Sequence, residues 1–194
     1  MAAAGDIYER ELKGLLSGDR KAITKMIKTC SEEETRSYNL MLEDPFLVIR
    51  AAGSLGVDLV ALRWDYSFPI EVKSSAEETM HFSRNPRLTE QAANMKEVCC
   101  RSSLLPVYAF RLKSVRGDPW RIFTIPTRNE LKGKNESLRE RIPKMEVTGN
   151  GNYVMRWGDG MKLCDLMSYM SDGNVPEEPD GVVSGGTPEE IYEE

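Results

Sequence analysis

The sequence predicts an α/β fold for one domain followed by an acidic tail. Helical periodicity dominates the first part of the chain, short strand-like segments occupy the centre, and an amphipathic helix separates two groups of strands. The chain has 194 residues, of which 40% are hydrophobic and 29% charged, and a mean hydropathy of −0.45, which is typical of a soluble globular domain. We expect residues 1–170 to form the domain and residues 171–194 the tail.

The first helix is predicted over residues 6–16, with Asp6 as its N-cap. Apolar side chains at helical spacing form one stripe along it: Tyr8, Leu12, Leu15 and Leu16. Glu9 lies at the edge of that stripe. This carboxylate therefore either caps the helix or is held beside a site.

Residues 17–45 are predicted to form a helical insert of two short helices. Ser31 and Glu34 have the spacing of a capping box, which indicates where the second helix begins. Asp44-Pro45 then ends the helical pattern, because proline disfavours helical backbone in the residue before it.

The remaining elements are predicted from changes of period along the chain. A meander of three short strands is expected at residues 46–51, 57–62 and 68–73. An amphipathic helix follows, then two strands and a last short helix, at residues 88–102, 107–112, 120–125 and 163–170.

Residue types argue against several classes of site. The four cysteines form no C-x-x-C pair and His81 is the single histidine, so a zinc site, a disulfide scaffold and a Ser-His-Asp triad are unsupported. We interpret the cysteines as reduced residues of an intracellular protein. Membrane insertion and secretion are not expected, because no apolar run approaches the roughly 18 residues of a membrane span and no signal-peptide pattern begins the chain.

Charge is unevenly distributed along the chain. The net charge is −5, but residues 171–194 hold eight acids and no base, a composition that favours disorder. Without that tail the rest carries a net charge of +3, and residues 84–144 hold fourteen bases and six acids. The folded body could therefore bind a polyanion. The alternative is an ordinary solvated charged surface.

Two acids and a lysine are predicted to converge in the strand meander. Glu71 and Lys73 share one face of the third strand, and Asp58 can join them if the register places it opposite Glu71, since adjacent strands lie about 4.8 Å apart. Two carboxylates suit a hard cation such as Mg²⁺, and a lysine can orient or deprotonate a water. The pattern predicts metal-assisted phosphodiester hydrolysis, with Glu9 in reach of the metal. The alternative is a surface salt bridge.

Six short segments follow one another in a recognisable order. They are Glu9-Arg10-Glu11-Leu12, Val48-Ile49-Arg50-Ala51-Ala52-Gly53-Ser54, Val57-Asp58-Leu59-Val60, Ile70-Glu71-Val72-Lys73-Ser74-Ser75, Glu90-Gln91-Ala92 and Gly151-Asn152-Tyr153-Val154. In this order they resemble the motifs of the archaeal Holliday junction resolvases, members of the PD-(D/E)xK nuclease superfamily. The chain departs from that pattern in three ways: Val57 stands where the family has proline, the helical insert is longer, and the tail is acidic.

The resemblance implies a restriction-endonuclease-like fold, in which helices flank a central mixed β-sheet. It also implies a twofold homodimer that presents two identical sites to four-way junction DNA. By the same resemblance, Asp58 and Glu71 bind Mg²⁺, Glu9 completes the acidic site, and Lys73 serves the attacking water. Mn²⁺ is the expected substitute for Mg²⁺.

Further residues are candidates for the site because of their places in the motifs or in the chain. By the resemblance, Ser54 corresponds to a serine near the scissile phosphate in some family members, and Arg10 and Arg50 to basic residues that contact DNA. His81 and Arg84 lie together in a polar segment after the third strand. These two residues are candidates for phosphate contact, with an ordinary loop as the alternative.

We therefore expect a Mg²⁺-dependent, structure-selective endonuclease that resolves four-way DNA junctions in recombination and repair, in the cytoplasm with the nucleoid. Two alternatives stay open. One is a repair or restriction-type nuclease that acts on other duplexes. The other is a protein that binds junctions without cleaving them, which would result if the insert or the tail blocked the site.

Overall fold

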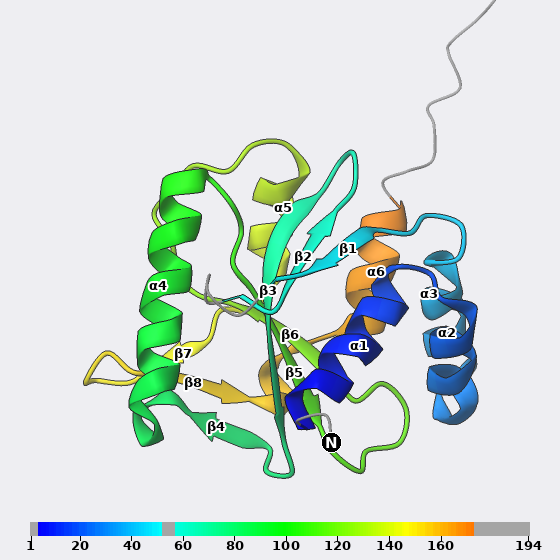
Figure 1. Ribbon diagram of the computed structural model, residues 1–194, viewed down its shortest axis with the longest axis horizontal. Helices are drawn as coiled ribbons and strands as arrows, with labels where there is room; N and C mark the ends of the chain where they lie inside the picture. The colour runs from blue at the N-terminus through cyan, green and yellow to red at the C-terminus, as the bar shows by residue number, and fades with distance from the viewer. Residues whose placement is uncertain (1–3, 52–56, 173–194) are drawn as a thin grey trace, which may run out of the picture.

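A six-stranded mixed sheet runs through the centre of the computed structural model, which describes residues 4–51 and 57–172 (Figure 1). Its strand order is β1-β2-β3-β5-β6-β9. The bounds are β1 Leu47–Arg50, β2 Leu59–Leu62, β3 Ser67–Ser75, β5 Val107–Leu112, β6 Trp120–Thr124 and β9 Met161–Lys162. Strands β3 and β5 run parallel and all other neighbours antiparallel. The parallel pair needs a crossover, and α4 (Pro86–Ser102) is its helix.

Helices lie on both sides of this sheet (Figure 1). One side is covered by the two terminal helices and the two short helices of residues 17–45: α1 Ala4–Leu16, α2 Arg20–Met26, α3 Glu32–Leu40 and α6 Leu163–Asp172. On the other side lie α4 and a small antiparallel sheet ordered β4-β8-β7, with bounds β4 Thr79–His81, β8 Tyr153–Arg156 and β7 Glu146–Val147. A fifth helix, α5, spans Lys134–Arg141, and single 3₁₀ turns cover Ile27–Thr29, Phe82–Arg84 and Trp157–Asp159.

The two faces of the sheet bury two separate apolar clusters. Strand β5 shows the division, because Val107 and Ala109 belong to the cluster beneath α1 and α6, whereas Tyr108 and Phe110 belong to the cluster beneath α4. This alternation follows from the two-residue period of a strand. A polar residue placed on either face is therefore surrounded by apolar side chains.

The expectation of an α/β protein with helices around a mixed sheet agrees with this architecture. The capping box is confirmed, since Ser31 Oγ accepts from Glu34 N (3.2 Å) and the Glu34 carboxylate accepts from Ser31 N (3.0 Å). Residues 17–45 contain two helices, as predicted. Their status as an insert relative to resolvases remains a prediction.

Two predicted boundaries are wrong. Helix α1 begins at Ala4, so Asp6 lies in its first turn and is not the N-cap; its carboxylate instead pairs with Arg10 and Arg50. Helix α6 continues to Asp172, two residues into the segment assigned to the tail. The rest of the predicted tail lies outside the described residues.

The sequence did not reveal the small sheet or α5. Strands β4 and β7 have three and two residues, which is too short for an alternating pattern to be recognised. Helix α5 buries only Leu138 and is otherwise polar, so it has no apolar stripe. In the described ranges no helix has the length and apolar character that a membrane span requires.

A buried aspartate ties three elements together on the α1 side of the sheet. The Asp118 carboxylate accepts hydrogen bonds from Tyr38 Oη of α3, from Trp120 N at the start of β6 and from Cys164 N of α6, each 2.9 Å long. Burial raises the pKa of Asp118, and these three hydrogen bonds oppose the rise.

We expect Asp118→Ala to lower the free energy of unfolding by about 3 kcal/mol, because three buried donors lose their acceptor at once. Denaturant unfolding followed by circular dichroism measures this change. Asp159→Ala, which removes an exposed carboxylate, should change stability by less than about 0.5 kcal/mol. Equal stability of the two variants would contradict the structural role of Asp118.

Candidate functional site

Asp58, Glu71 and Lys73 meet on the face of the sheet that α4 covers, and we call these three residues the acid–lysine site. The antiparallel register pairs Leu59 with Ile70, and Asp58 N donates to Ile70 O (3.0 Å), so Asp58 lies beside Glu71. Asp58 comes one residue before β2, where the sequence had placed it inside the strand. Ile70 is buried in the cluster on the opposite face, as strand alternation requires.

Hydrogen bonds hold one oxygen of each carboxylate. Asp58 Oδ2 accepts from Val72 N (2.7 Å), and Glu71 Oε1 accepts from Lys73 Nζ (2.6 Å). Lys73 Nζ also donates to Gln91 Oε1 of α4 (3.1 Å). Glu71 Oε2 is buried and has no hydrogen-bond partner among the described residues. The site therefore contains a carboxylate oxygen that is shielded from water and free to bind another group.

Burial and repulsion from nearby acids raise the pKa values of the two acids of the site, Asp58 and Glu71. The Glu71 side chain is 2% exposed, and burial raises its pKa to about 7; the nearby charges of Asp58 and Glu9 add to the rise, while Lys73 opposes it. Burial also raises the pKa of Asp58, against the hydrogen bond from Val72 N. Two carboxylates that are costly to ionise together would both be stabilised by a cation.

The third predicted metal ligand, Glu9, lies near enough for its charge to raise the pKa of Asp58 and Glu71, but its carboxylate is ion-paired with Arg50. Glu9 Oε2 accepts from Arg50 Nη2 (2.6 Å), and Arg50 also pairs with Asp6. Within residues 4–51 and 57–172, no group of three or more His, Cys, Asp or Glu side chains is arranged to hold a metal ion. The described residues therefore fit a cation held by two carboxylates, Asp58 and Glu71, and do not bring Glu9 into one ligand group with them.

The basic residues predicted to contact DNA lie in two places: Arg10 and Arg50 lie beside Asp6, and His81 and Arg84 lie at the end of β4 and in the turn after it. Arg50, at the end of β1, and Arg10, on α1, are both ion-paired with Asp6, so their charges are partly neutralised. His81 ends β4, where it is half-buried and pairs with Val154 of β8; Arg84 is exposed in the 3₁₀ turn that follows. Ser54 lies outside the described residues.

Tyr108 is a residue of the site that sequence reasoning missed. It is paired with Glu71 in the parallel β3–β5 register, its side chain is fully buried, and its hydroxyl has no hydrogen-bond partner among the described residues. Burial and the negative charge of Glu71 raise its pKa well above the ordinary range. In the sequence Tyr108 is one residue of an apolar strand, and only the pairing with β3 brings it to the acids. Gln91, which belongs to one of the six short segments, contacts Lys73.

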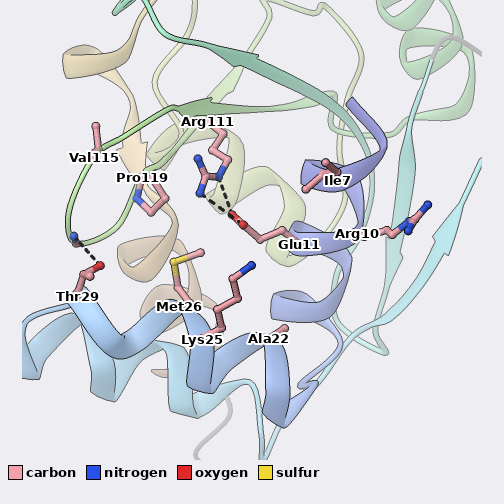
Figure 2. A pocket seen from close by; sticks show the side chains of 11 residues that line it. Ile7, Arg10, Glu11, Ala22, Lys25, Met26, Thr29, Arg111, Val115 and Pro119 are labelled. Atoms are coloured by element: carbon pink, nitrogen blue, oxygen red, sulfur yellow. Dashed lines mark hydrogen bonds and ion pairs between the residues drawn. The ribbon is translucent and has the colours of Figure 1, made fainter. Parts of the chain in front are cut away.

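A separate hollow of about 360 Å³ lies between α1, α2 and the β5–β6 loop (Figure 2). Apolar side chains such as Met26 and Pro119 line it together with Lys25 and an ion pair in which Arg111 Nε donates to Glu11 Oε1 (2.7 Å). Trp120 Nε1 also donates to Glu11 Oε1 (3.0 Å). None of the residues of the acid–lysine site lines this hollow.

Comparisons with known proteins find similar solved structures but no matching family. No family model matches the chain, and no curated protein matches it. Among solved structures, Hjc from Archaeoglobus fulgidus, a Holliday junction resolvase from an archaeal hyperthermophile, is similar over 86% of this chain and 97% of its own, with 16% identity and a TM-score of 0.48. A likeness of this strength does not assign this chain to a family.

The raised pKa of Glu71 predicts how stability depends on pH. The folded-state pKa of about 7 exceeds the ordinary value of 4.5, so between these values the folded protein binds more protons than the unfolded chain. The contribution of Glu71 to stability is therefore full below the lower value and is lost as pH rises through the upper one. Relative to Glu71→Gln, the wild type should lose about 2–3 kcal/mol of unfolding free energy between about pH 5 and about pH 8.

Denaturant unfolding across this pH range, without divalent metal, measures the difference. Glu77→Gln is the control, since it removes an exposed carboxylate shortly after β3. Parallel profiles for the wild type and Glu71→Gln would show that the Glu71 carboxyl is not perturbed by its surroundings.

Proposed function

We propose that the chain is a metal-dependent endonuclease that hydrolyses DNA phosphodiester bonds at the acid–lysine site and acts on four-way junctions. The observation that carries the proposal is the convergence of Asp58, just before β2, with Glu71 and Lys73 of the neighbouring β3, with Glu71 Oε2 buried and unpartnered among the described residues. A buried carboxylate of this kind is costly unless it binds a cation. The motif order that resembles the archaeal resolvases supports the same activity.

Asp58 Oδ1 and Glu71 Oε2 are the oxygens that would hold Mg²⁺, because the other oxygen of each carboxylate already accepts a hydrogen bond. The bound ion would stabilise charge on the phosphate and lower the pKa of a coordinated water. Lys73 Nζ is fixed between Glu71 and Gln91, so its charge lies in a constant position beside the carboxylates. In this arrangement the lysine neutralises negative charge that gathers on a phosphate and orients the attacking water.

The junction substrate and a homodimer belong to this proposal as well. A four-way junction needs two matched nicks, which two identical sites related by a twofold axis would supply. Strand β1 forms one edge of the sheet and exposes Leu47 (65%) and Ile49 (48%), both on the same face of the strand. We propose that this apolar face contacts the second copy, and that the enzyme works on chromosomal DNA at the nucleoid.

One observation favours a second candidate, a protein that binds junctions without cleaving them. The described residues contain no group of three metal-binding side chains, and Glu9 is paired with Arg50. Cleavage and binding therefore have to be measured separately on the same DNA.

We expect the wild type to nick a labelled four-way junction in Mg²⁺, and Asp58→Asn to cut about 1,000-fold more slowly, equivalent to ~4 kcal/mol of lost transition-state stabilisation. Gel analysis of the cleavage products measures the rate, and a linear duplex of the same sequence tests selectivity. Asp159→Asn, an exposed change of the same type, should cut at the wild-type rate. Equal cutting of both DNAs would indicate a general nuclease, and junction binding without any cutting would favour the second candidate.

Lys73→Gln should lower the cleavage rate about 100-fold while Mg²⁺ binding, measured by calorimetry, persists. The reason is that the amide keeps a donor for Glu71 Oε1 but loses the positive charge. A variant that lost metal binding and cleavage in parallel would assign Lys73 a structural role in place of the catalytic one.

A further inference from the structure

Helix α2 and the turn after it expose four positive side chains on one side. Arg20, Lys21, Lys25 and Lys28 are all exposed, and residues 20–28 contain no acid. We call these four residues together with Thr24 the α2 basic face. The opposite side of the helix is apolar and packs into the core through Ile23 and Met26.

The spacing of these cations destabilises the isolated helix, because like charges on neighbouring turns repel one another. Lys21 and Lys25 are four residues apart, and Arg20 and Lys28 are each four residues from Thr24, so like charges gather on neighbouring turns. None of the four cations forms an ion pair with another described residue. Arg10, Arg50, Lys73 and Arg111 do have carboxylate partners. The cations of the α2 basic face therefore repel one another and have no ion-pair partner among the described residues, and an external polyanion would relieve this repulsion.

The face is presented on a firmly placed helix. The Asp19 carboxylate caps α2 by accepting from Lys21 N (2.8 Å) and Ala22 N (2.9 Å). Gly14 lets α1 approach closely, since a Cβ there would lie 2.8 Å from Ala22 Cβ. A shallow hollow of about 310 Å³ is lined by the five residues of the face, and Lys25 also borders the larger hollow of Figure 2.

We propose that the α2 basic face binds the sugar-phosphate backbone of a duplex arm of the DNA substrate, at a distance from the bond that is cut. Figure 1 shows α2 on the side of the sheet opposite α4, whereas the acid–lysine site faces α4, so this contact is separate from the site of cleavage. Lysine, arginine and threonine side chains are typical donors to phosphate oxygens and carry no base sequence information. This inference rests on the proposed function, because it takes DNA as the substrate.

The position of Thr24 in the middle of the face provides a sharp test. Thr24→Glu places a carboxylate among the four cations. Thr24→Gln introduces an uncharged side chain of the same size as glutamate. Binding of the full chain to a four-way junction is measured in EDTA, where cleavage does not interfere. We expect Thr24→Glu to bind about tenfold more weakly at low salt, with a slope of log K against log salt smaller by about 2, and Thr24→Gln to bind like the wild type.

A second variant and a charge-matched control complete the experiment. Lys21→Gln with Lys25→Gln should also reduce the slope by about 2, since two phosphate contacts are lost. Asn94→Glu adds the same charge on the exposed side of α4 and should bind within about twofold of the wild type. Circular dichroism checks that each variant is folded.

The outcomes separate this inference from the proposed function. Equal binding by Thr24→Glu and Thr24→Gln, in a protein that still cuts junctions, would overturn the inference alone and leave an acidic protein segment as the occupant of the face. Equal weakening by Thr24→Glu and Asn94→Glu would also overturn it, because only net charge would then matter. A wild type that binds DNA through α2 but cuts none would refute the endonuclease and retain the contact.

Discussion

The Glu71 side chain, only 2% exposed, is buried by the same packing that forms the sheet, so its charged carboxylate carries a desolvation cost that its neighbours must offset. Lys73 Nζ, at 2.6 Å, offsets part of that cost, and Gln91 holds the lysine in place. The remaining cost is visible in the raised pKa of Glu71. A carboxylate that is only partly compensated in this way contributes little to the stability of the fold, and we propose that a bound cation compensates the rest of its desolvation cost.

The parallel pairing of β3 with β5 determines which groups surround that carboxylate. Because α4 crosses over to connect the two strands, Gln91 of the helix contacts Lys73, and Tyr108 of β5 is paired with Glu71. The opposite face of the sheet is occupied by the larger apolar cluster. There Asp118 links α3, β6 and α6 through three hydrogen bonds. The sheet thus separates a polar site on one side from a structural anchor and the α2 basic face on the other.

The charges of the chain divide into those that are internally compensated and those that are not. Arg50 bridges Asp6 and Glu9, and Arg111 binds Glu11, so these basic residues stabilise the placement of α1 on the sheet. The cations of α2 have no such partners among the described residues. A net charge of −5 conceals this division, because affinity for a polyanion depends on local and uncompensated positive charge.

The sequence by itself determined the elements whose signals are local. Strand alternation put Glu71 and Lys73 on one face, the capping box placed the start of α3, and the apolar run of β5 had its observed bounds, because each depends on residues close together in the chain. The tertiary structure decided which residues that are distant in sequence contact one another. The pairing of Arg50 with Glu9, the approach of Tyr108 to Glu71 and the hydrogen bond of Tyr38 to the buried Asp118 join segments that are far apart in sequence. Periodicity cannot encode such contacts, since they depend on strand order and on which helix covers which face.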